Sequence, residues 1–259
     1  MLHNALKQRL AADEVAISMQ VRLVESVEIA HIAKAAGFDC FYIDLEHCAM
    51  SLRTVSQICV SAIAGGIAPM VRTGNLSHDN VGRLLDIGAL GIIAPHIRTA
   101  DDARKLVDAC RFPPSGSRSV SVGLPHFLHR PVPPLDARRM LDDATLVCVM
   151  IESLDALENV DAIAAVDGLD LMLVGTNDLT AEMGIGREFD HPRVEAAYER
   201  ILAAGKAHGV HVGIGGLSGR SDLVNKYVGR GARFISSGSD LQFLATAAAA
   251  KVEALRAGS

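Results

Sequence analysis

The sequence predicts an α/β fold, namely a single (β/α)8 TIM barrel that occupies residues 1–259 as one domain. Short apolar strands alternate with helices eight times along the chain, which is the pattern of such a barrel. Several strands run directly into charged residues, as expected at the rim of a barrel enzyme. An open doubly wound sheet is the main alternative, but it usually contains fewer units, and no GxGxxG motif follows the first strand.

The first half of the chain contains four strand–helix units. Strands are expected at 14–22, 39–46, 68–72 and 91–97. Helices follow at 26–36, 51–66 and 77–87, and a glycine stands at or just after the end of each. A fourth helix is expected to begin at Thr99, which would cap it, with Asp101 and Asp102 in its first turn.

An irregular segment at 113–134 interrupts this alternation. Loops of that length are uncommon unless they act as lids or join neighbouring subunits, so a loop over the barrel mouth is expected. The alternation then resumes with strands at 145–151, 170–174, 210–214 and 233–236. The remaining helices are expected at 154–166, 191–208, 221–228 and from residue 240 onward.

The composition excludes several classes of protein. Hydrophobic residues make up 49% of the 259 residues, which is enough for an extensive core. The formal net charge is −5 and no run of Lys or Arg stands out, so no nucleic-acid surface is expected. The first residues are too polar for a signal peptide, and no apolar run reaches the roughly 18 residues of a membrane helix. No membrane partner is therefore expected.

The five cysteines are scattered and never form a CxxC pair. They are expected to be reduced thiols in a cytoplasmic protein, most of them buried. Cys48 follows His47 on the expected rim, but a nucleophilic role is the weaker interpretation, because that strand offers no recognisable oxyanion donors.

Ionisable and amide residues collect at the carboxyl ends of the expected strands. Catalytic groups of a barrel of this kind lie at that end. The residues concerned are Arg22, Glu46, His47, Arg72, His96, Glu152, Asn177 and Asp178.

Glu152 and Asp178 end consecutive strands. Because adjacent strands lie about 4.8 Å apart, the two carboxylates can share one ion. Oxygen ligands without a thiolate or a pair of histidines favour Mg²⁺ or Mn²⁺, with waters completing an octahedron. The alternatives are a salt bridge for Glu152 and a helix N-cap for Asp178.

Three further residues have candidate roles in catalysis. Arg72 could hold a carboxylate or an enolate oxygen, or it could form an ion pair with Asp44 or Glu46. His47 is a candidate general base, with a hydrogen-bonded structural histidine as the alternative. Asp86 is either a surface acid at a helix end or a partner that orients His47.

Two further observations concern how a carbonyl substrate would be activated. The small residues around Gly175, Thr176 and Asn177 let backbone amides approach an anion. No lysine ends an expected strand among apolar neighbours, so Schiff-base chemistry is not favoured. A metal acting as a Lewis acid would have to activate the carbonyl compound.

Seven segments, taken together, resemble one known family, the HpcH/HpaI or class II pyruvate aldolases. Any one segment is weak, but their order and spacing cover nearly the whole chain. The segments are 42–47 (YIDLEH), 70–72 (MVR), 84–88 (LLDIG), 112–118 (FPPSGSR), 150–152 (MIE), 174–179 (VGTNDL) and 183–184 (MG).

This resemblance implies reversible retro-aldol cleavage of a 4-hydroxy-2-oxo acid into pyruvate and an aldehyde, with Mg²⁺, Mn²⁺ or Co²⁺ as cofactor. Glu152 and Asp178 would be the metal ligands, and Arg72 would steady the pyruvyl oxygen and its enolate. His47, oriented by Asp86, would handle the proton of the C4 hydroxyl. The backbone amides of Asn177 and Asp178 would hold the pyruvyl carboxylate. Asp44 and Glu46 would lie behind these groups, near the waters of the metal.

The resemblance also implies a homo-oligomer, a hexamer built as a trimer of dimers, whose C-terminal helix is exchanged between subunits. The chain departs from the family pattern at Met150, Thr176 and Ser119, which bears on the choice of aldehyde more than on the reaction. Arg118 and Leu124 in the irregular segment are candidates for an acceptor-binding loop. Other possible functions are a citrate-synthase-like condensation, an acyl-CoA lyase, or a barrel that binds a carboxylate or metal without turnover.

Overall fold

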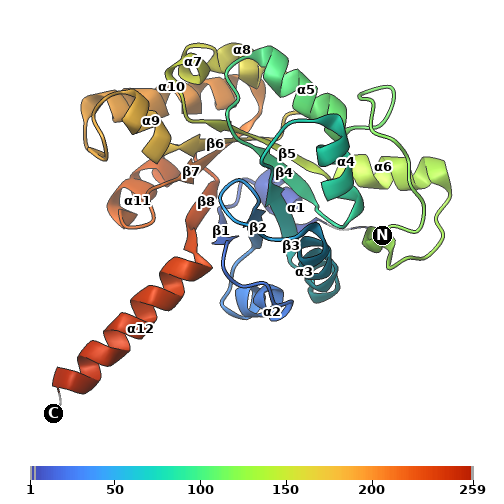
Figure 1. The fold of residues 1–259 in the computed structure, drawn as a ribbon. Coiled ribbons are helices and arrows are strands. Elements are labelled where there is room, and N and C mark those ends of the chain that lie inside the picture. Colours follow the sequence, from blue (N-terminus) through green and yellow to red (C-terminus); the bar gives the residue numbers. More distant parts are fainter. Residues whose placement is uncertain (1, 3, 258–259) are drawn as a thin grey trace.

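The computed structural model describes residue 2 and residues 4–257, and it confirms the predicted barrel (Figure 1). Within this part of the chain the strands pair in sequence order, every pair is parallel, and the last strand closes onto the first. The strands are β1 (Ala16–Val21), β2 (Cys40–Asp44), β3 (Ala68–Arg72), β4 (Gly91–Ala94), β5 (Leu146–Ile151), β6 (Leu171–Gly175), β7 (His211–Gly215) and β8 (Phe234–Ser239).

Helices surround the barrel and carry the chain back from each strand to the next (Figure 1). Those at expected positions are α2 (Glu28–Ala35), α3 (Leu52–Gly65), α4 (His78–Asp86), α5 (Ala100–Cys110), α7 (Leu154–Glu158), α8 (Val160–Ala164), α10 (Pro192–His208), α11 (Ser221–Gly229) and α12 (Asp240–Ala257). Four elements lie outside the expected helix ranges, namely α1 (Ala5–Ala11), the short η1 (Pro125–Phe127), α6 (Pro134–Ala144) and α9 (Thr176–Glu182).

The helix ends follow the local signals in the sequence. Thr99 caps α5, and its hydroxyl and the Asp102 carboxylate satisfy each other's backbone N–H groups in a capping box. Ser51 accepts a hydrogen bond from the Thr54 N–H at the start of α3. Gly209 ends α10 in the left-handed conformation, with φ of 70°, which a residue without a Cβ adopts at little cost.

Two layers of apolar side chains hold the barrel together. Side chains such as Phe41 and Ile43 point outward from β2 and pack under the helices, whereas Tyr42 points inward. The interior is filled by residues of alternate strand positions, including Met70 and Cys148, so it is a core and not a channel. Helix α1 adds its buried leucines to the inner layer and so closes the amino-terminal end of the barrel.

The segment at 113–134 lies at the amino-terminal end of the barrel, so the prediction of a loop over the mouth is wrong for a single chain. It connects the end of α5 to α6 and β5, and such helix-to-strand connections lie at the end opposite the mouth. The His126 ring lies 3.1 Å from the carbonyl oxygen of Ala89, just before β4, which fixes the segment there.

His126 gives an expected pH dependence of stability. Its Nε2–H donates to the Ala89 carbonyl oxygen, while its Nδ1 is buried without a partner, so a proton on Nδ1 would have no acceptor. Burial lowers the pKa of His126 from 6.5 to about 4, and the nearby Arg118 charge adds to the effect. The unfolded chain therefore takes up a proton between pH 6.5 and 4 that the folded chain does not.

As the pH falls from 6.5 to 4, we expect this difference in protonation of His126 to lower the free energy of unfolding by about 3 kcal/mol. His126→Gln keeps a donor for the Ala89 carbonyl but does not titrate. Denaturant unfolding at a series of pH values should show a flatter curve for the variant between pH 4 and 6.5. Parallel curves for the variant and the original protein would contradict this account.

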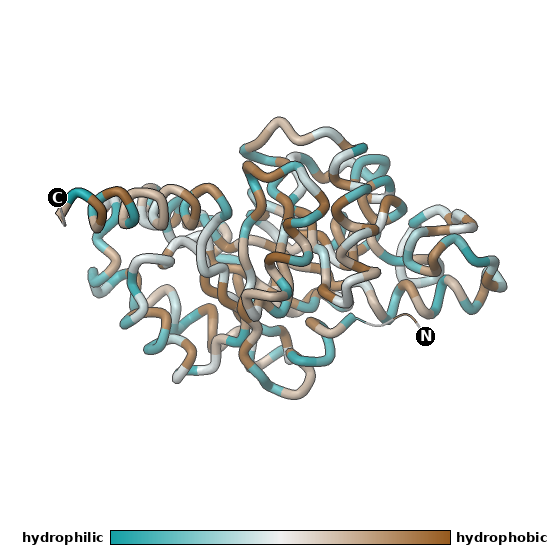
Figure 2. The backbone as a smooth tube through the Cα atoms, turned by 90° about the horizontal axis from the view of Figure 1, so that it is seen from below, coloured by the Kyte–Doolittle hydropathy of each residue, from teal (hydrophilic) through white to brown (hydrophobic). Residues whose placement is uncertain are grey.

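Helix α12 extends away from the barrel (Figure 1). The Asp240 carboxylate anchors its start, because it accepts hydrogen bonds from the backbone N–H groups of Arg22, Leu23 and Val24. Hydrophobic residues recur along the rest of the helix (Figure 2), and several of them are exposed, namely Leu241, Phe243, Leu244, Val252 and Leu255. The single chain thus leaves apolar surface on this helix uncovered.

No helix in the described part of the chain is both long enough and apolar enough to span a membrane.

Candidate active site

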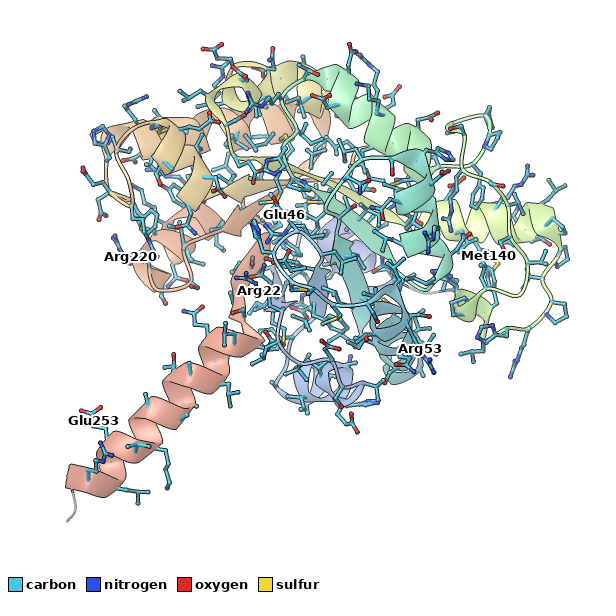
Figure 3. All side chains as sticks on the ribbon, in the orientation of Figure 1. Arg22, Glu46, Arg53, Met140, Arg220 and Glu253 are labelled. Carbon is cyan, nitrogen blue, oxygen red and sulfur yellow. The ribbon has the colours of Figure 1, made fainter. Side chains whose placement is uncertain are left out.

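A cavity of about 490 Å³ opens at the carboxyl ends of the strands. Tyr42, Met150 and Leu173 from the barrel interior form its apolar floor, and the rest of the lining is mostly polar. Figure 3 places the labelled Arg22 and Glu46 together at the centre of this end, with Arg220 at the periphery. The polar lining residues are Gln20, Arg22, His47, Arg72, Thr176, Asn177, Asp178, Arg187, Ser218, Ser236, Ser239 and Gln242.

A larger groove of about 730 Å³ lies at the opposite end of the barrel, beside α10 and α11. Several of its charged groups are already paired, since Arg230 binds Glu199 and Arg233 binds Asp13. It contains none of the strand-end residues that the sequence singled out. The smaller cavity is therefore the candidate active site.

Arg72 lies at the end of β3, and its guanidinium forms ion pairs with two carboxylates. Its Nε and Nη2 atoms bind the Asp44 oxygens at 2.9 and 2.7 Å, and its Nη1 lies 3.0 Å from Glu46. The register of β2 and β3 places Asp44 directly opposite Arg72. The ion-pair interpretation of Arg72 is therefore confirmed, and Arg72 also lines the cavity, so its role toward a substrate stays a prediction.

Asp44 is a fully buried carboxylate with many donors around it. Gln20 donates to it from β1, Arg22 lies 3.3 Å away, and the backbone N–H groups of Glu46 and His47 also donate. Burial alone would raise the pKa of Asp44, but the hydrogen bonds and charge of Arg72 hold it below its usual value. The ionised form of Asp44 is thus favoured, and its hydrogen bonds tie together the ends of β1, β2 and β3.

Glu152 follows β5 and is also buried, but no Arg or Lys among the described residues binds it. It accepts a hydrogen bond of 2.7 Å from the backbone N–H of His96. Burial raises the pKa of Glu152, and the negative charges of Asp178 and Glu46 raise it further. A carboxylate in this position gains from a nearby cation.

The second oxygen of Glu152 lies against the backbone of Gly175. A Cβ at position 175 would lie 2.7 Å from the Glu152 Cβ and 2.9 Å from its Oε2, so any side chain there would displace the carboxylate. Asp178 lies in the first turn of α9, and its carboxylate makes no hydrogen bond or ion pair within the described residues. The N-cap alternative for Asp178 is therefore wrong, because no side chain caps α9.

These two carboxylates suit one hard divalent cation. They repel each other, no Arg or Lys in the described chain binds either of them, and oxygen is the ligand type that Mg²⁺ and Mn²⁺ prefer. The described residues contain no cluster of three or more His, Cys, Asp or Glu side chains that could hold a metal ion. Water and substrate would have to supply the other ligands, which is usual for Mg²⁺.

His96 is the site residue whose contacts the sequence did not reveal. Its ring lies between Glu46 and Glu152, with Nε2 at 2.8 Å from the Glu46 carboxylate and Nδ1 at 3.3 Å from the Glu152 carboxylate. It adopts a φ of 58°, a left-handed conformation that costs energy for a residue with a side chain. Its place at a strand end was visible in the sequence, but the backbone turn that aims it at Glu152 was not.

His47 lines the cavity with about half of its side chain exposed, and its Nε2 lies 3.5 Å from Glu46. Asp86 does not orient it within one chain, so that prediction is wrong for the single chain. Helix α4 runs back from the mouth, and Asp86 is its last residue, just before β4 begins. There it accepts a hydrogen bond of 2.9 Å from Arg118.

Arg118 and Leu124 do not reach the cavity of their own chain either. The Arg118 side chain is almost fully buried, with its guanidinium 4.7 Å from the centre of the Phe112 ring. Leu124 packs with Phe112 and Leu141 in a small apolar cluster. Both residues therefore hold the irregular segment to the amino-terminal end of the barrel and do not bind an acceptor there.

Thr176 and Met150 are two of the departures from the family pattern, and both have structural partners. The buried Thr176 hydroxyl donates to the Gly215 carbonyl at 2.6 Å and lies 2.7 Å from the Tyr198 hydroxyl. It thereby ties the start of α9 to β7 and α10. Met150 Sδ lies 3.9 Å from Arg72 on the cavity floor.

The sequence matches the model of the HpcH/HpaI aldolase/citrate lyase family over residues 19–247. The 4-hydroxy-4-methyl-2-oxoglutarate aldolase tasA of Hapsidospora irregularis is 40% identical over 248 residues, which are 95% of this chain and 92% of that protein. The 4-hydroxy-2-oxovalerate aldolase of Rhodococcus jostii is 34% identical over 254 residues, covering 93% and 92% of the two chains.

Solved structures agree with this placement. An HpcH/HpaI aldolase from Desulfitobacterium hafniense superposes with a TM-score of 0.90 at 29% identity, covering 98% of this chain and 97% of the other. The citrate synthase SbnG superposes with a TM-score of 0.88 at 26% identity, covering 99% of both chains.

Proposed function

Since the chain belongs to the HpcH/HpaI aldolase/citrate lyase family and is a carbon–carbon lyase, we propose that it cleaves a 4-hydroxy-2-oxo acid reversibly into pyruvate and an aldehyde or ketone, with a divalent metal as cofactor. Residues 1–259 act in this proposal as one barrel domain. The names of the two relatives describe substrates that end differently beyond C4, in a carboxylate and in a methyl group. Family membership alone therefore does not fix the second product.

One observation carries the proposal. Glu152 is a buried carboxylate with Asp178 nearby, no Arg or Lys in the described chain binds either of them, and Arg72 lies at the cavity that Asp178 lines. Glu152 and Asp178 would hold Mg²⁺, Mn²⁺ or Co²⁺, which as a Lewis acid polarises the keto group of the substrate. The ion would thus add its positive charge to that of Arg72 at this site.

The chain's own residues would do the rest. Arg72, held rigid by Asp44 and Glu46, donates to the keto oxygen and stabilises the negative charge that collects there as the C3–C4 bond breaks. His47 accepts the proton of the C4 hydroxyl, and the C4 carbonyl forms as the bonding electrons move to C3. The backbone amides of Asn177 and Asp178 would hold the pyruvyl carboxylate.

The proposal includes a homo-oligomer in which α12 packs on a neighbouring subunit, giving a hexamer. Support comes from the apolar residues that α12 leaves exposed in one chain. Sedimentation of the purified protein checks this, and a monomer at micromolar concentration would contradict it. The unpaired state of all five cysteines agrees with a reducing compartment, which we propose to be the cytoplasm.

Metal removal tests the function. After treatment with EDTA and desalting, release of pyruvate from 4-hydroxy-2-oxo acids should disappear, and added Mg²⁺, Mn²⁺ or Co²⁺ should restore it. The control is the same protein carried through desalting without chelator. Full activity after chelation, with the metal content measured and absent, would exclude the proposed cofactor.

A citrate-synthase-like condensation at the same site is the second candidate, favoured by the similarity to citrate synthase SbnG over the whole chain. Both reactions pass through an enolate, whose negative charge Arg72 would stabilise. Turnover of oxaloacetate with an acyl-CoA that exceeded cleavage of every hydroxy-oxo acid tested would select this candidate instead.

A further inference from the structure

One of the arginines that line the cavity forms no ion pair with a carboxylate in the described part of the chain. Three arginines line it, namely Arg22, Arg72 and Arg187, whereas Asp178 supplies the single carboxylate among its described lining residues. Arg72 is matched by Asp44 and Glu46 behind it, and Arg22 shares Asp44. Arg187 forms no ion pair with any carboxylate in the described part of the chain, so it is the unmatched cation of the cavity.

Arg187 lies in the loop that follows α9 and contacts an aromatic ring of the same loop. Its guanidinium carbon lies 5.6 Å from the centre of the Phe189 ring, and Phe189 itself is buried. On the far side of the loop, Arg220 binds the Asp190 carboxylate through two contacts of 2.6 and 2.7 Å. Asp190 is therefore engaged elsewhere, and the adjacent Glu188 makes no ion pair with Arg187.

Arg193 braces the other end of this loop, because its Nη1 donates to the Met183 carbonyl at 2.9 Å. The cavity lining also includes Ser218, Ser239 and Gln242, which are hydrogen-bonding groups and not apolar ones. This lining suits a polar group at the outer end of a substrate and offers little to an alkyl or aryl chain. A guanidinium fork matches the geometry of a carboxylate, to which it can donate two parallel hydrogen bonds.

We propose that Arg187 is a specificity residue that binds a second carboxylate of the substrate, beyond C4. The preferred substrates are then dicarboxylic 4-hydroxy-2-oxo acids, and the carbonyl compound released with pyruvate is itself an oxo acid. This inference rests on the proposed function, because it takes the pyruvyl half of the substrate to lie near Arg72, Glu152 and Asp178.

The test uses two substrates that differ only beyond C4. The Mg²⁺-loaded protein is assayed with 4-hydroxy-2-oxoglutarate, which ends in a carboxylate, and with 4-hydroxy-2-oxopentanoate, which ends in a methyl group. The original protein should prefer the dicarboxylate in kcat/KM. Arg187→Gln should reduce that preference by roughly 10- to 100-fold, mainly through KM, as expected for loss of hydrogen bonds to a charged group.

Two further variants separate charge from structure. Arg187→Lys keeps the charge without the fork and should retain part of the preference. Arg200→Gln is the matched control, because Arg200 lies exposed on α10 and donates to the Glu158 carbonyl, away from the cavity. It should leave the preference unchanged. An equal fall for both substrates in Arg187→Gln, or a preference of the original protein for the methyl-ended substrate, would overturn the proposal.

A binding measurement keeps this inference separate from the proposed function. Calorimetry compares 2-oxoglutarate with 2-oxopentanoate, two acids that lack the C4 hydroxyl and cannot be cleaved. If 2-oxoglutarate binds more tightly than 2-oxopentanoate and Arg187→Gln abolishes the difference, the role of Arg187 is supported. This holds even if neither hydroxy acid is cleaved, a result that would refute only the aldolase assignment. If the two acids bind equally and the protein is an active aldolase, only the role of Arg187 is refuted.

Discussion

Glu152→Gln is expected to lower pyruvate release on the order of 10³-fold, because it removes one of the two carboxylates proposed to hold the metal. The loss of Lewis-acid stabilisation in the transition state is worth several kcal/mol, and each 1.36 kcal/mol is about tenfold in rate. The fold should survive, because a Gln carbonyl oxygen can still accept the hydrogen bond from the His96 N–H. Metal affinity by calorimetry and activity at saturating Mg²⁺ are measured together.

For the metal-free protein, we expect Glu152→Gln not to lower the stability. Burial and the charges of Asp178 and Glu46 all disfavour the ionised form of Glu152. Replacing it with a neutral amide of the same shape should therefore leave the metal-free protein at least as stable as before. A large fall in melting temperature without metal would show that Glu152 serves the fold and not a cation.

Glu182→Gln is the matched control for this experiment. Glu182 ends α9, accepts a hydrogen bond from the Leu154 N–H and lies 3.8 Å from the exposed Arg98. It is a glutamate close to the barrel mouth that is not part of the cavity lining. Its substitution should change activity by no more than about twofold, since exposed ion pairs contribute little. Retained activity in Glu152→Gln, equal to that of Glu182→Gln, would refute the metal site.

The barrel and the ends of its strands could be predicted because they depend on local signals. The run from Phe41 to Ile43 is apolar and must be buried, and Asp44 follows at the point where the strand reaches the rim. The pairing of Asp44 with Arg72 then comes from the parallel register of β2 and β3. Proximity along one edge of a closed sheet thus made the acid–arginine pair one of the stated alternatives.

The errors arose where a role depended on the direction of an element or on its backbone angles. Asp86 is the last residue of α4, which runs back from the barrel mouth, so Asp86 lies at the end opposite the cavity. The sequence pattern alone does not show that direction. The two prolines at 133 and 134 indicated a loop, although a proline in the first turn also begins a helix, as it does in α6. His96 reaches Glu152 through a left-handed backbone turn that sequence patterns for a non-glycine residue do not indicate.

Arg72→Met is expected to lower both the stability of the protein and its rate. It leaves the buried Asp44 without its strongest partner, and breaking a buried ion pair from one side costs about 3–5 kcal/mol. It also removes the donor that faces the developing enolate, which is worth roughly 10²–10³ in kcat. Urea unfolding and steady-state kinetics measure the two effects independently.

A double-mutant cycle separates the two effects of Arg72. Asp44→Asn combined with Arg72→Met removes both charges of the pair, so much of the lost stability should return, because no buried carboxylate is then left unmatched at position 44. Glu46 keeps its contact of 2.8 Å with His96. Activity should stay as low as in the single variant, because the enolate still lacks its donor. If activity returned together with stability, Arg72 would act only by holding the ends of β2 and β3, and the electrostatic role would be refuted.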